Sequence, residues 1–121
     1  MEARGQKDMK VLHYDEVKAE TAEGGAYKTK LRWLITKKMG AENFAMRFFE
    51  MEAGGYSPLH THPWEHEVFI LDGEGEIFDG KSSRHFGSDD VVFIPPNELH
   101  QFRNKGSVIL KFLCLIPYKK E

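Results

Sequence analysis

The chain has almost no cysteine. Cys114 is the single cysteine among 121 residues, so an internal disulfide is excluded. Proteins built on a disulfide framework carry several cysteines and usually come from oxidising compartments. A lone thiol fits a reducing environment, and we expect a cytoplasmic protein.

Long apolar runs and an excess of basic charge are also missing. No stretch approaches the roughly 20 apolar residues that a membrane-spanning helix needs, and residues 1–10 are too polar for a signal peptide. The formal net charge is -2 at pH 7, and no arginine-rich run is present that could neutralise phosphates. These absences predict no membrane partner and no nucleic-acid partner.

Sustained helical periodicity is absent, and short strand-like runs take its place. They are rich in β-branched and aromatic residues, with glycine or proline turn signals between them, and they cover residues 31–36, 44–51, 66–72, 76–79, 91–94, 100–103 and 108–116. Short strands at this spacing are typical of an all-β sandwich or barrel. We therefore predict a single antiparallel β-barrel domain over residues 1–121, with residues 1–9 as a flexible tail.

The segments around these runs allow three further predictions. Residues 11–14 are expected to form a short strand, and residues 20–27, which contain Gly24-Gly25, are expected to form a loop. Asp72-Gly73 lies between two strand-like runs, a pattern typical of a β-hairpin turn.

Histidines are concentrated in one stretch. His60, His62 and His66 lie within seven positions of a chain that has six histidines. Residues two apart on a strand point the same way, so His60 and His62 project together, and a strand restarting at His66 can bring a third imidazole beside them. His100 follows a rigid Pro-Pro-Asn turn downstream. Four imidazoles converging inside a barrel would bind a divalent transition metal, whereas the alternative is polar decoration of a turn.

The histidines belong to two ordered motifs. The first, G(X)5HXH(X)3,4E(X)6G, matches the spacing of Gly54, His60, His62, position 66 and Gly73. Together with the second motif, it resembles the signature of the cupin superfamily. The resemblance implies a cupin barrel of the jelly-roll, double-stranded β-helix type that holds a metal.

The second motif, G(X)5PXG(X)2H(X)3N, matches Pro95, His100 and Asn104. Asp89 and Asn97 stand where the motif has its glycines, and both residue types tolerate a left-handed backbone conformation. The fold is therefore expected to survive both departures. Asn104 is expected to brace the turn after His100.

One departure changes the chemistry of the site. Six residues separate position 66 from Gly73, so His66 takes the place of the family's glutamate, and Glu67 is expected to face the other side of its strand. The predicted metal ligands are then four neutral histidines, His60, His62, His66 and His100. Such a donor set is compatible with Mn, Fe, Cu, Zn or Ni.

The resemblance extends over most of the chain, to a subgroup of small single-domain cupins that carry HxHPWEHE, FLCLIP and NFxMRxF segments. It makes Cys114 a candidate pocket residue, although a small buried residue without a role is the alternative. Arg47 interrupts an apolar run and is a candidate anion-binding group, or else the structural partner of a carboxylate. Phe102 and Phe112 share strand faces with His100 and Cys114, as pocket residues or as core.

Residues beside the histidines form a candidate outer shell. Trp64, Glu65 and Glu67 could orient the ligands, because ligating histidines usually donate their second N–H to an acceptor; otherwise they lie at the barrel mouth without a role. His13 and His85 fall outside both motifs, and we expect them at the surface.

Three functions are compatible with such a site. The one we favour is a metal-dependent dioxygenase-type oxidoreductase acting on a small organic substrate, because the resemblance implies that histidine-rich cupin sites include dioxygenases. The alternatives are a Lewis-acid isomerase or lyase, and a non-catalytic module that binds a metal or ligand.

Apolar residues occupy both faces of one predicted strand. Phe69 and Leu71 alternate with Val68 and Ile70, whereas an antiparallel strand exposed to water on one face usually alternates with polar residues. We therefore expect the second apolar face to be buried against another copy of the chain, in a homodimer with an isologous interface.

Overall fold

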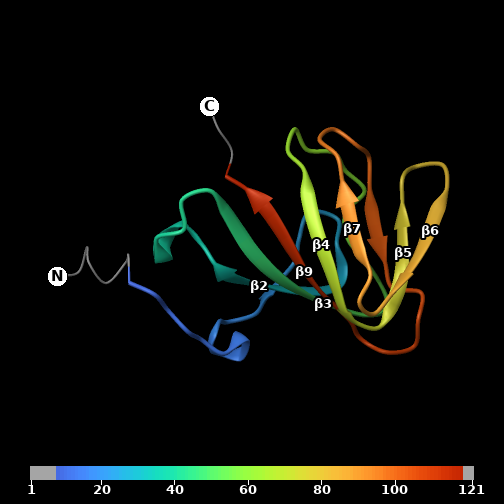
Figure 1. Ribbon diagram of the computed structural model, residues 1–121. Helices are drawn as coiled ribbons and strands as arrows, with labels where there is room; N and C mark the ends of the chain where they lie inside the picture. The colour runs from blue at the N-terminus through green and yellow to red at the C-terminus, as the bar shows by residue number, and fades with distance from the viewer. Residues whose placement is uncertain (1–7, 119–121) are drawn as a thin grey trace.

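The computed structural model describes residues 8–118, and almost all of its regular structure is strand (Figure 1). In chain order the elements are η1 (Tyr14–Glu16), β1 (Glu20–Thr21), β2 (Tyr27–Ile35), η2 (Lys37–Met39), β3 (Phe44–Tyr56), β4 (His66–Asp72), β5 (Glu74–Phe78), β6 (Ser83–Gly87), β7 (Val91–Ile94), β8 (Gln101–Arg103) and β9 (Leu110–Pro117). Neither 3-10 helix in this range is long and apolar enough to cross a membrane.

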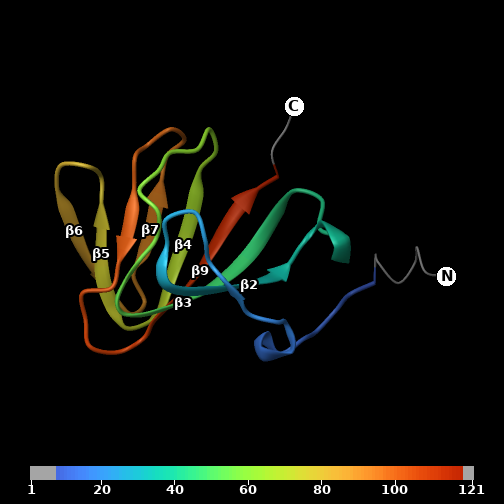
Figure 2. The same ribbon diagram turned by 180° about the vertical axis from the view of Figure 1, so that it is seen from behind.

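The strands form one curled antiparallel sheet, which confirms the predicted all-β fold. Its order is β6-β5-β8-β3-β9-β4-β7, and β1 and β2 extend it from the side of β3. Seen from both sides, β5 and β6 lie at one end of the molecule and β2 lies toward the other (Figures 1 and 2). Strand β3 is 13 residues long and reaches both regions, because it pairs with β2 and β9 along its length and with β8 at Tyr56.

The core lies on the concave face of the sheet. Every second residue of β4 (His66, Val68, Ile70) and of β9 (Leu110, Phe112, Cys114) is buried, as expected for strands with one face on the core. Phenylalanine rings stack through the centre, with ring-centre distances of 5.0 Å for Phe49–Phe112 and 4.8 Å for Phe102–Phe112. Full burial of a Phe side chain contributes about 1.5–3 kcal/mol, so this stack is a main source of stability.

Local predictions fail at residues 11–14 and 20–27, and one strand was missed. Residues 11–13 form no strand, and Tyr14 begins η1, which His13 caps by accepting the Asp15 backbone N–H at 3.4 Å. The predicted loop at residues 20–27 contains β1 and the first residue of β2. Strand β6 was not predicted at all: its sequence, SRHFG, is mostly polar and buries just one hydrophobic residue, Phe86.

Asp72-Gly73 does not form a hairpin. Strand β4 pairs with β7 and β9, whereas β5 pairs with β6 and β8, so the connection crosses between two parts of the sheet. Gly73 has φ 92°, and a Cβ atom there would lie 2.9 Å from the Ile109 carbonyl oxygen. The glycine therefore lets the crossing chain pass close to the segment that leads into β9.

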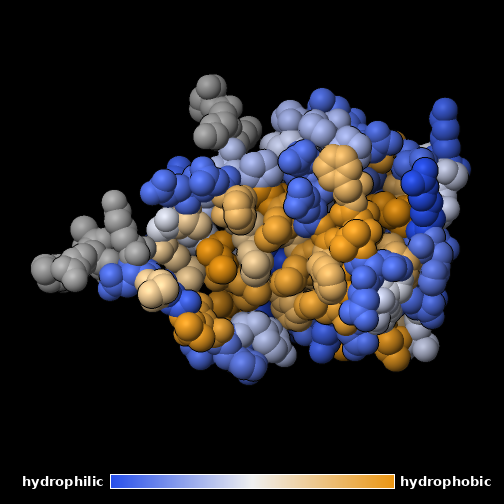
Figure 3. All heavy atoms as spheres, viewed as in Figure 1, coloured by the Kyte–Doolittle hydropathy of each residue, from blue (hydrophilic) through white to orange (hydrophobic). Residues whose placement is uncertain are grey.

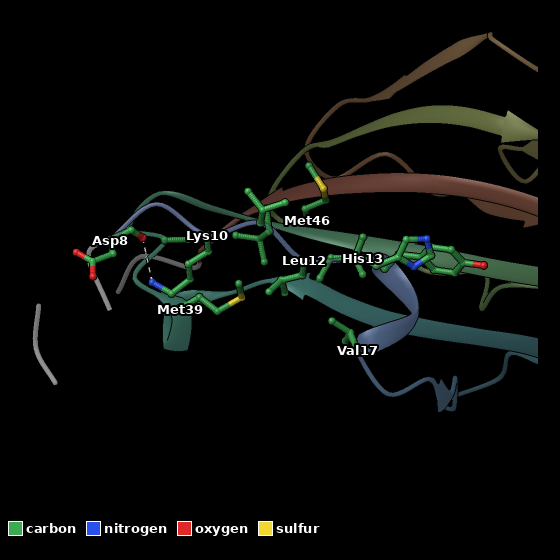
Figure 4. A pocket seen from close by; sticks show the side chains of 12 residues that line it. Asp8, Lys10, Leu12, His13, Val17, Met39 and Met46 are labelled. Atoms are coloured by element: carbon green, nitrogen blue, oxygen red, sulfur yellow. Dashed lines mark hydrogen bonds between the residues drawn. The ribbon is translucent and has the colours of Figure 1, made fainter. Parts of the chain in front are cut away.

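The segment before β1 packs against β3, where the rings of Tyr14 and Phe48 lie 4.9 Å apart. It borders a hollow of about 500 Å³, which Leu12, Val17, Met39 and Met46 line among others (Figure 4). Residues 1–7 of the predicted tail lie outside the described residues, and Asp8 and Met9 are exposed.

Candidate metal centre

Backbone hydrogen bonds bring the two motifs together. The His60 N–H donates to the His100 carbonyl at 3.2 Å, and the His100 N–H donates to the His60 carbonyl at 3.1 Å. The Asn97 N–H donates to the His62 carbonyl at 2.6 Å, which ties the Pro-Pro-Asn turn to the first motif. Asn97 has φ 68° and Asp89 has φ 74°, so both residues adopt the left-handed conformation that their residue types tolerate.

Three of the four predicted ligands form a cluster. One ring nitrogen from each of His60, His62 and His100 lies within 4.8 Å of the others. The His60 ring centre is 4.2 Å from that of His62 and 4.9 Å from that of His100. Two nitrogens that share an ion through bonds of about 2.0–2.1 Å lie no more than about 4.2 Å apart. Three nitrogens within 4.8 Å of one another could therefore share one ion after a small movement of their rings.

His66 lies next to this cluster. Its ring centre is 4.9 Å from that of His100 and 5.1 Å from that of His62. Its Nδ1 is 3.4 Å from the Cys114 Sγ, and its Nε2 is buried without a hydrogen-bond partner. A buried, unpaired imidazole nitrogen beside three others is suited to a metal, but the role of His66 as fourth ligand stays a prediction.

Burial keeps these imidazoles neutral. It lowers the pKa of His60 to about 4, and the neighbouring His62, His100 and Arg47 act in the same direction. It lowers the pKa of His66 to about 3, with His100 as the next contributor. The pKa values of His62 and His100 are also lowered, first by burial. Neutral imidazole is the form that binds a metal, so these ring nitrogens could bind one at neutral pH.

Hydrogen bonds at the ring edges also fit a metal site. His100 Nδ1 lies 2.9 Å from the Glu98 carbonyl oxygen, which can only accept, so Nδ1 carries the proton and Nε2 has a free lone pair. Ligating histidines typically donate their second N–H in this way. Trp64 stacks on His62 with ring centres 4.4 Å apart, and this stacking restricts the orientation of the His62 ring. These residues fit a divalent transition metal.

Arg47 enters the same region from β3. Its Nη2 lies 3.0 Å from the Cys114 Sγ, and Cys114 in turn contacts His66. Burial raises the pKa of the Cys114 thiol, an effect that Arg47 opposes. Arg47 and Cys114 therefore lie beside the histidines.

The remaining candidate pocket and outer-shell residues differ in burial. Phe102 and Phe112 are buried in the stacked core, below the histidines. Glu65 is exposed, and Glu67 lies on the outer face of β4, as predicted for its side of the strand. A direct role in orienting the histidines stays a prediction for both glutamates.

The other polar predictions are confirmed. His13 and His85 are exposed. Asn104 is buried and braces its turn, because its Nδ2 donates to the carbonyls of Met51 and Val108 and its Oδ1 accepts the Gly106 N–H.

Two aromatic residues near the site were not predicted. The Trp33 and Phe49 rings lie 5.5 Å and 5.0 Å from the Arg47 guanidinium carbon. Trp33 reaches Arg47 because the two residues are register partners between β2 and β3. The strand pattern of residues 31–36 carried no signal for that pairing.

The edge strands leave an open groove that leads to the cluster. Strands β6 and β7 border a hollow of about 640 Å³, whose lining includes Phe86, Val92, Ile94 and His100. His100 therefore contributes both to the histidine cluster and to a cavity large enough for a small molecule.

The comparison with known families agrees with this geometry. Residues 47–116 match the family model of the Cupin domain. The chain belongs to the cupin family. This cupin resembles the polyketide cyclase RemF from Streptomyces resistomycificus, whose structure superposes with a TM-score of 0.86 and 35% identity, covering 93% of this chain and 81% of that one.

Two curated proteins are also similar to this cupin. The 1-methylthio-D-xylulose 5-phosphate methylsulfurylase of Rhodospirillum rubrum is 36% identical over 76 residues, which cover 63% of this chain and 49% of that protein. This cupin thus spans about half of the methylsulfurylase. An oxalate-binding protein from Thermotoga maritima is 32% identical over 96 residues, covering 77% of this chain and 78% of that protein.

Proposed function

We propose that this cupin is a metal-dependent enzyme that acts on a small organic substrate with oxygen donor atoms. The observation that carries the proposal is the cluster of His60, His62 and His100, neutral at physiological pH and placed beside the cation of Arg47. A set of neutral nitrogen ligands with a nearby cation favours a substrate that itself brings negative charge.

The chain's own residues supply binding and orientation. The histidines would hold the metal, with His66 as the fourth ligand, and the phenylalanine stack below them would keep water away from the reacting atoms. When bound, a divalent transition metal would supply Lewis-acid polarisation of a substrate oxygen or, if it is redox-active, activation of dioxygen.

Lewis-acid chemistry is the reaction class that we favour, such as ring closure, isomerisation or elimination. Its support comes from the structural likeness to a polyketide cyclase and from similarity to a methylsulfurylase. A dioxygenase-type oxidation is the second candidate. The buried, unpaired His66 Nε2 favours it, because it points to a site with histidine ligands alone.

Metal content is the first test. Inductively coupled plasma mass spectrometry on untagged protein is expected to find about one transition-metal ion per chain, and its identity would select among Mn, Fe, Cu, Zn and Ni. The double variant His60→Ala/His62→Ala should lose the metal, because it removes two of the clustered nitrogens. His85→Ala is the matched control, since His85 is exposed and bonded to Glu74. An absence of metal from the parent protein after reconstitution would reject the proposal.

Dependence on oxygen separates the candidate functions. The metal-loaded protein would be assayed with phenolic acids and β-diketones, with and without air, by oxygen electrode and mass spectrometry. Product formation without oxygen supports the Lewis-acid reaction, and stoichiometric oxygen uptake supports the dioxygenase. Tight binding of these compounds with no conversion would leave a binding module, a role consistent with the similarity to an oxalate-binding protein.

The proposal includes a cytoplasmic homodimer. The outer face of β4, β7 and β9 carries a broad apolar surface, seen as a continuous orange area in Figure 3. Phe69, Val91 and Phe93 are exposed there and, with Leu113 and Leu115, border a hollow of about 440 Å³. Patches of this kind mark interaction sites, and a second copy of the chain is the occupant that we propose.

A further inference from the structure

Arg47 has no acidic partner within residues 8–118. The one hydrogen bond that it makes there is to the Cys114 sulfur, and its Nε is buried without a partner. Arg32, one strand away, has an unpartnered Nε as well, but it lies 3.8 Å from the carboxylate of Glu50 and donates to the carbonyls of Tyr14 and Val17. A guanidinium has five N–H donors, so Arg47 keeps several donors that no residue in 8–118 satisfies.

The surroundings of Arg47 keep its guanidinium in place. It lies beside the rings of Trp33 and Phe49, which stabilise a cation through their π faces. These rings satisfy none of its N–H donors. Because Arg47 contacts Cys114 and Cys114 contacts His66, a single intervening side chain connects the cation to His66, which lies next to the histidine cluster.

Trp33 lines a groove between the segment before β1, β2 and the start of β3. It has a volume of about 480 Å³, and Trp33, Ala45 and Tyr118 contribute to its walls. Lysines outnumber acids along it, with Lys18, Lys37 and Lys38 against Glu20. Trp33 therefore offers an aromatic surface to the groove and to Arg47, in a setting that favours negative charge.

We propose that Arg47 binds the anionic group of the substrate and that Trp33 and the adjoining groove receive its planar remainder. The substrate is thus an aromatic or otherwise planar acid with an oxygen donor next to its charge, placed between the histidines and Trp33. This inference rests on the proposed function and specifies the substrate class of that site.

The test measures the binding of defined probes to zinc-loaded protein by titration calorimetry. Salicylate is a planar acid, salicylamide is its neutral counterpart, and 1-hydroxy-2-naphthoate adds a second ring. Arg47→Met should weaken salicylate binding by about 10-fold or more, the loss expected for a hydrogen bond to a charged group, while salicylamide binding changes less than about twofold. Trp33→Ala should remove the advantage of the naphthoate over salicylate.

Controls distinguish this role from a structural one. Lys30→Met removes one positive charge from an exposed site on β2 and should leave salicylate affinity unchanged. Arg47→Lys keeps the charge and should retain part of the affinity, which supplies a test if Arg47→Met does not fold. Thermal unfolding of each variant monitors the fold.

Three results are decisive. If Arg47→Met holds zinc and binds salicylate as tightly as the parent protein, the role of Arg47 is overturned and the metal site stands. If the zinc-loaded parent binds none of the planar acids, the substrate class is overturned. If the parent binds no metal at all, the proposed function itself fails.

Discussion

At the residue scale, the fold lowers the pKa of the site histidines below the ordinary value. Burial is the largest cause at His60, His62, His66 and His100 alike. The imidazoles are therefore neutral at pH 7, and each has one nitrogen lone pair that could bind a ligand. The same burial makes the stability of the metal-free protein depend on pH.

We predict that the metal-free protein loses stability as the pH falls from 6.5 to 5. The unfolded chain protonates these histidines near their ordinary pKa of 6.5, whereas the folded chain has a pKa of about 4 at His60 and about 3 at His66. Between these values the unfolded state binds more protons, so acid favours unfolding. Urea unfolding midpoints at pH 7.5, 6.5 and 5 would measure the effect.

A matched pair of variants assigns this pH dependence to the cluster. His66→Asn should flatten it, because it removes the most strongly shifted group. Asn43→Ala, which changes an exposed side chain that does not titrate, should leave it unchanged. An equally steep loss of stability in His66→Asn would contradict the assignment.

At the element scale, the connection between β4 and β5 decides how the sheet curls. The two strands are separated by one residue, Gly73, yet they pair with different partners. Gly75, early in β5, is buried where the crossing chain meets β8 and β9. A Cβ there would overlap the Arg103 carbonyl oxygen and would lie 3.1 Å from the Phe86 ring and 3.2 Å from Leu110.

We predict that Gly75→Ala destabilises the protein by about 1–3 kcal/mol, the usual cost of overpacking a dense interior. The backbone oxygen of Arg103 cannot move aside without disturbing the β5–β8 pairing. Gly87→Ala is the control, since its Cβ would meet just the Gly73 carbonyl oxygen at 4.0 Å, and it should change stability by less than about 0.5 kcal/mol. Equal unfolding midpoints for both variants in guanidinium chloride would refute the prediction.

At the scale of the whole molecule, large apolar side chains lie on both faces of the sheet. The concave face holds the core and the histidines, and the outer face exposes Phe69, Val91 and Phe93. An isolated protomer would leave that outer face in water, at a cost of about 25 cal/mol per Å² of apolar surface. A second copy would remove this cost.

We predict a mass of twice 14.0 kDa by light scattering at micromolar concentrations. Phe93→Asp should shift the protein to the monomer, because Phe93 is 59% exposed, borders the hollow of the apolar face, and a carboxylate buried there is costly. Val108→Asp, at a residue of similar exposure outside that face, should leave the mass unchanged. A monomeric parent protein would rule out the dimer.

Local sequence patterns predicted the structure correctly where a few neighbouring residues determine the backbone conformation. Alternating apolar residues indicated most of the strands, and the motif spacings singled out the histidines that cluster in the structure. The tolerance of Asp89 and Asn97 for the left-handed conformation that they adopt and the bracing role of Asn104 also followed from the two motifs, because turn chemistry depends on a few adjacent residues.

What the sequence by itself determined is therefore the strand content, the family resemblance and the candidate histidines, three of which cluster in the structure. The tertiary structure alone decided that Asp72-Gly73 crosses between parts of the sheet, that the polar residues 83–87 form a strand, and that Trp33 lies beside Arg47. The physical reason is that strand pairing joins residues far apart in the chain. A period of two shows which side chains share a face, but not which neighbouring strand that face meets.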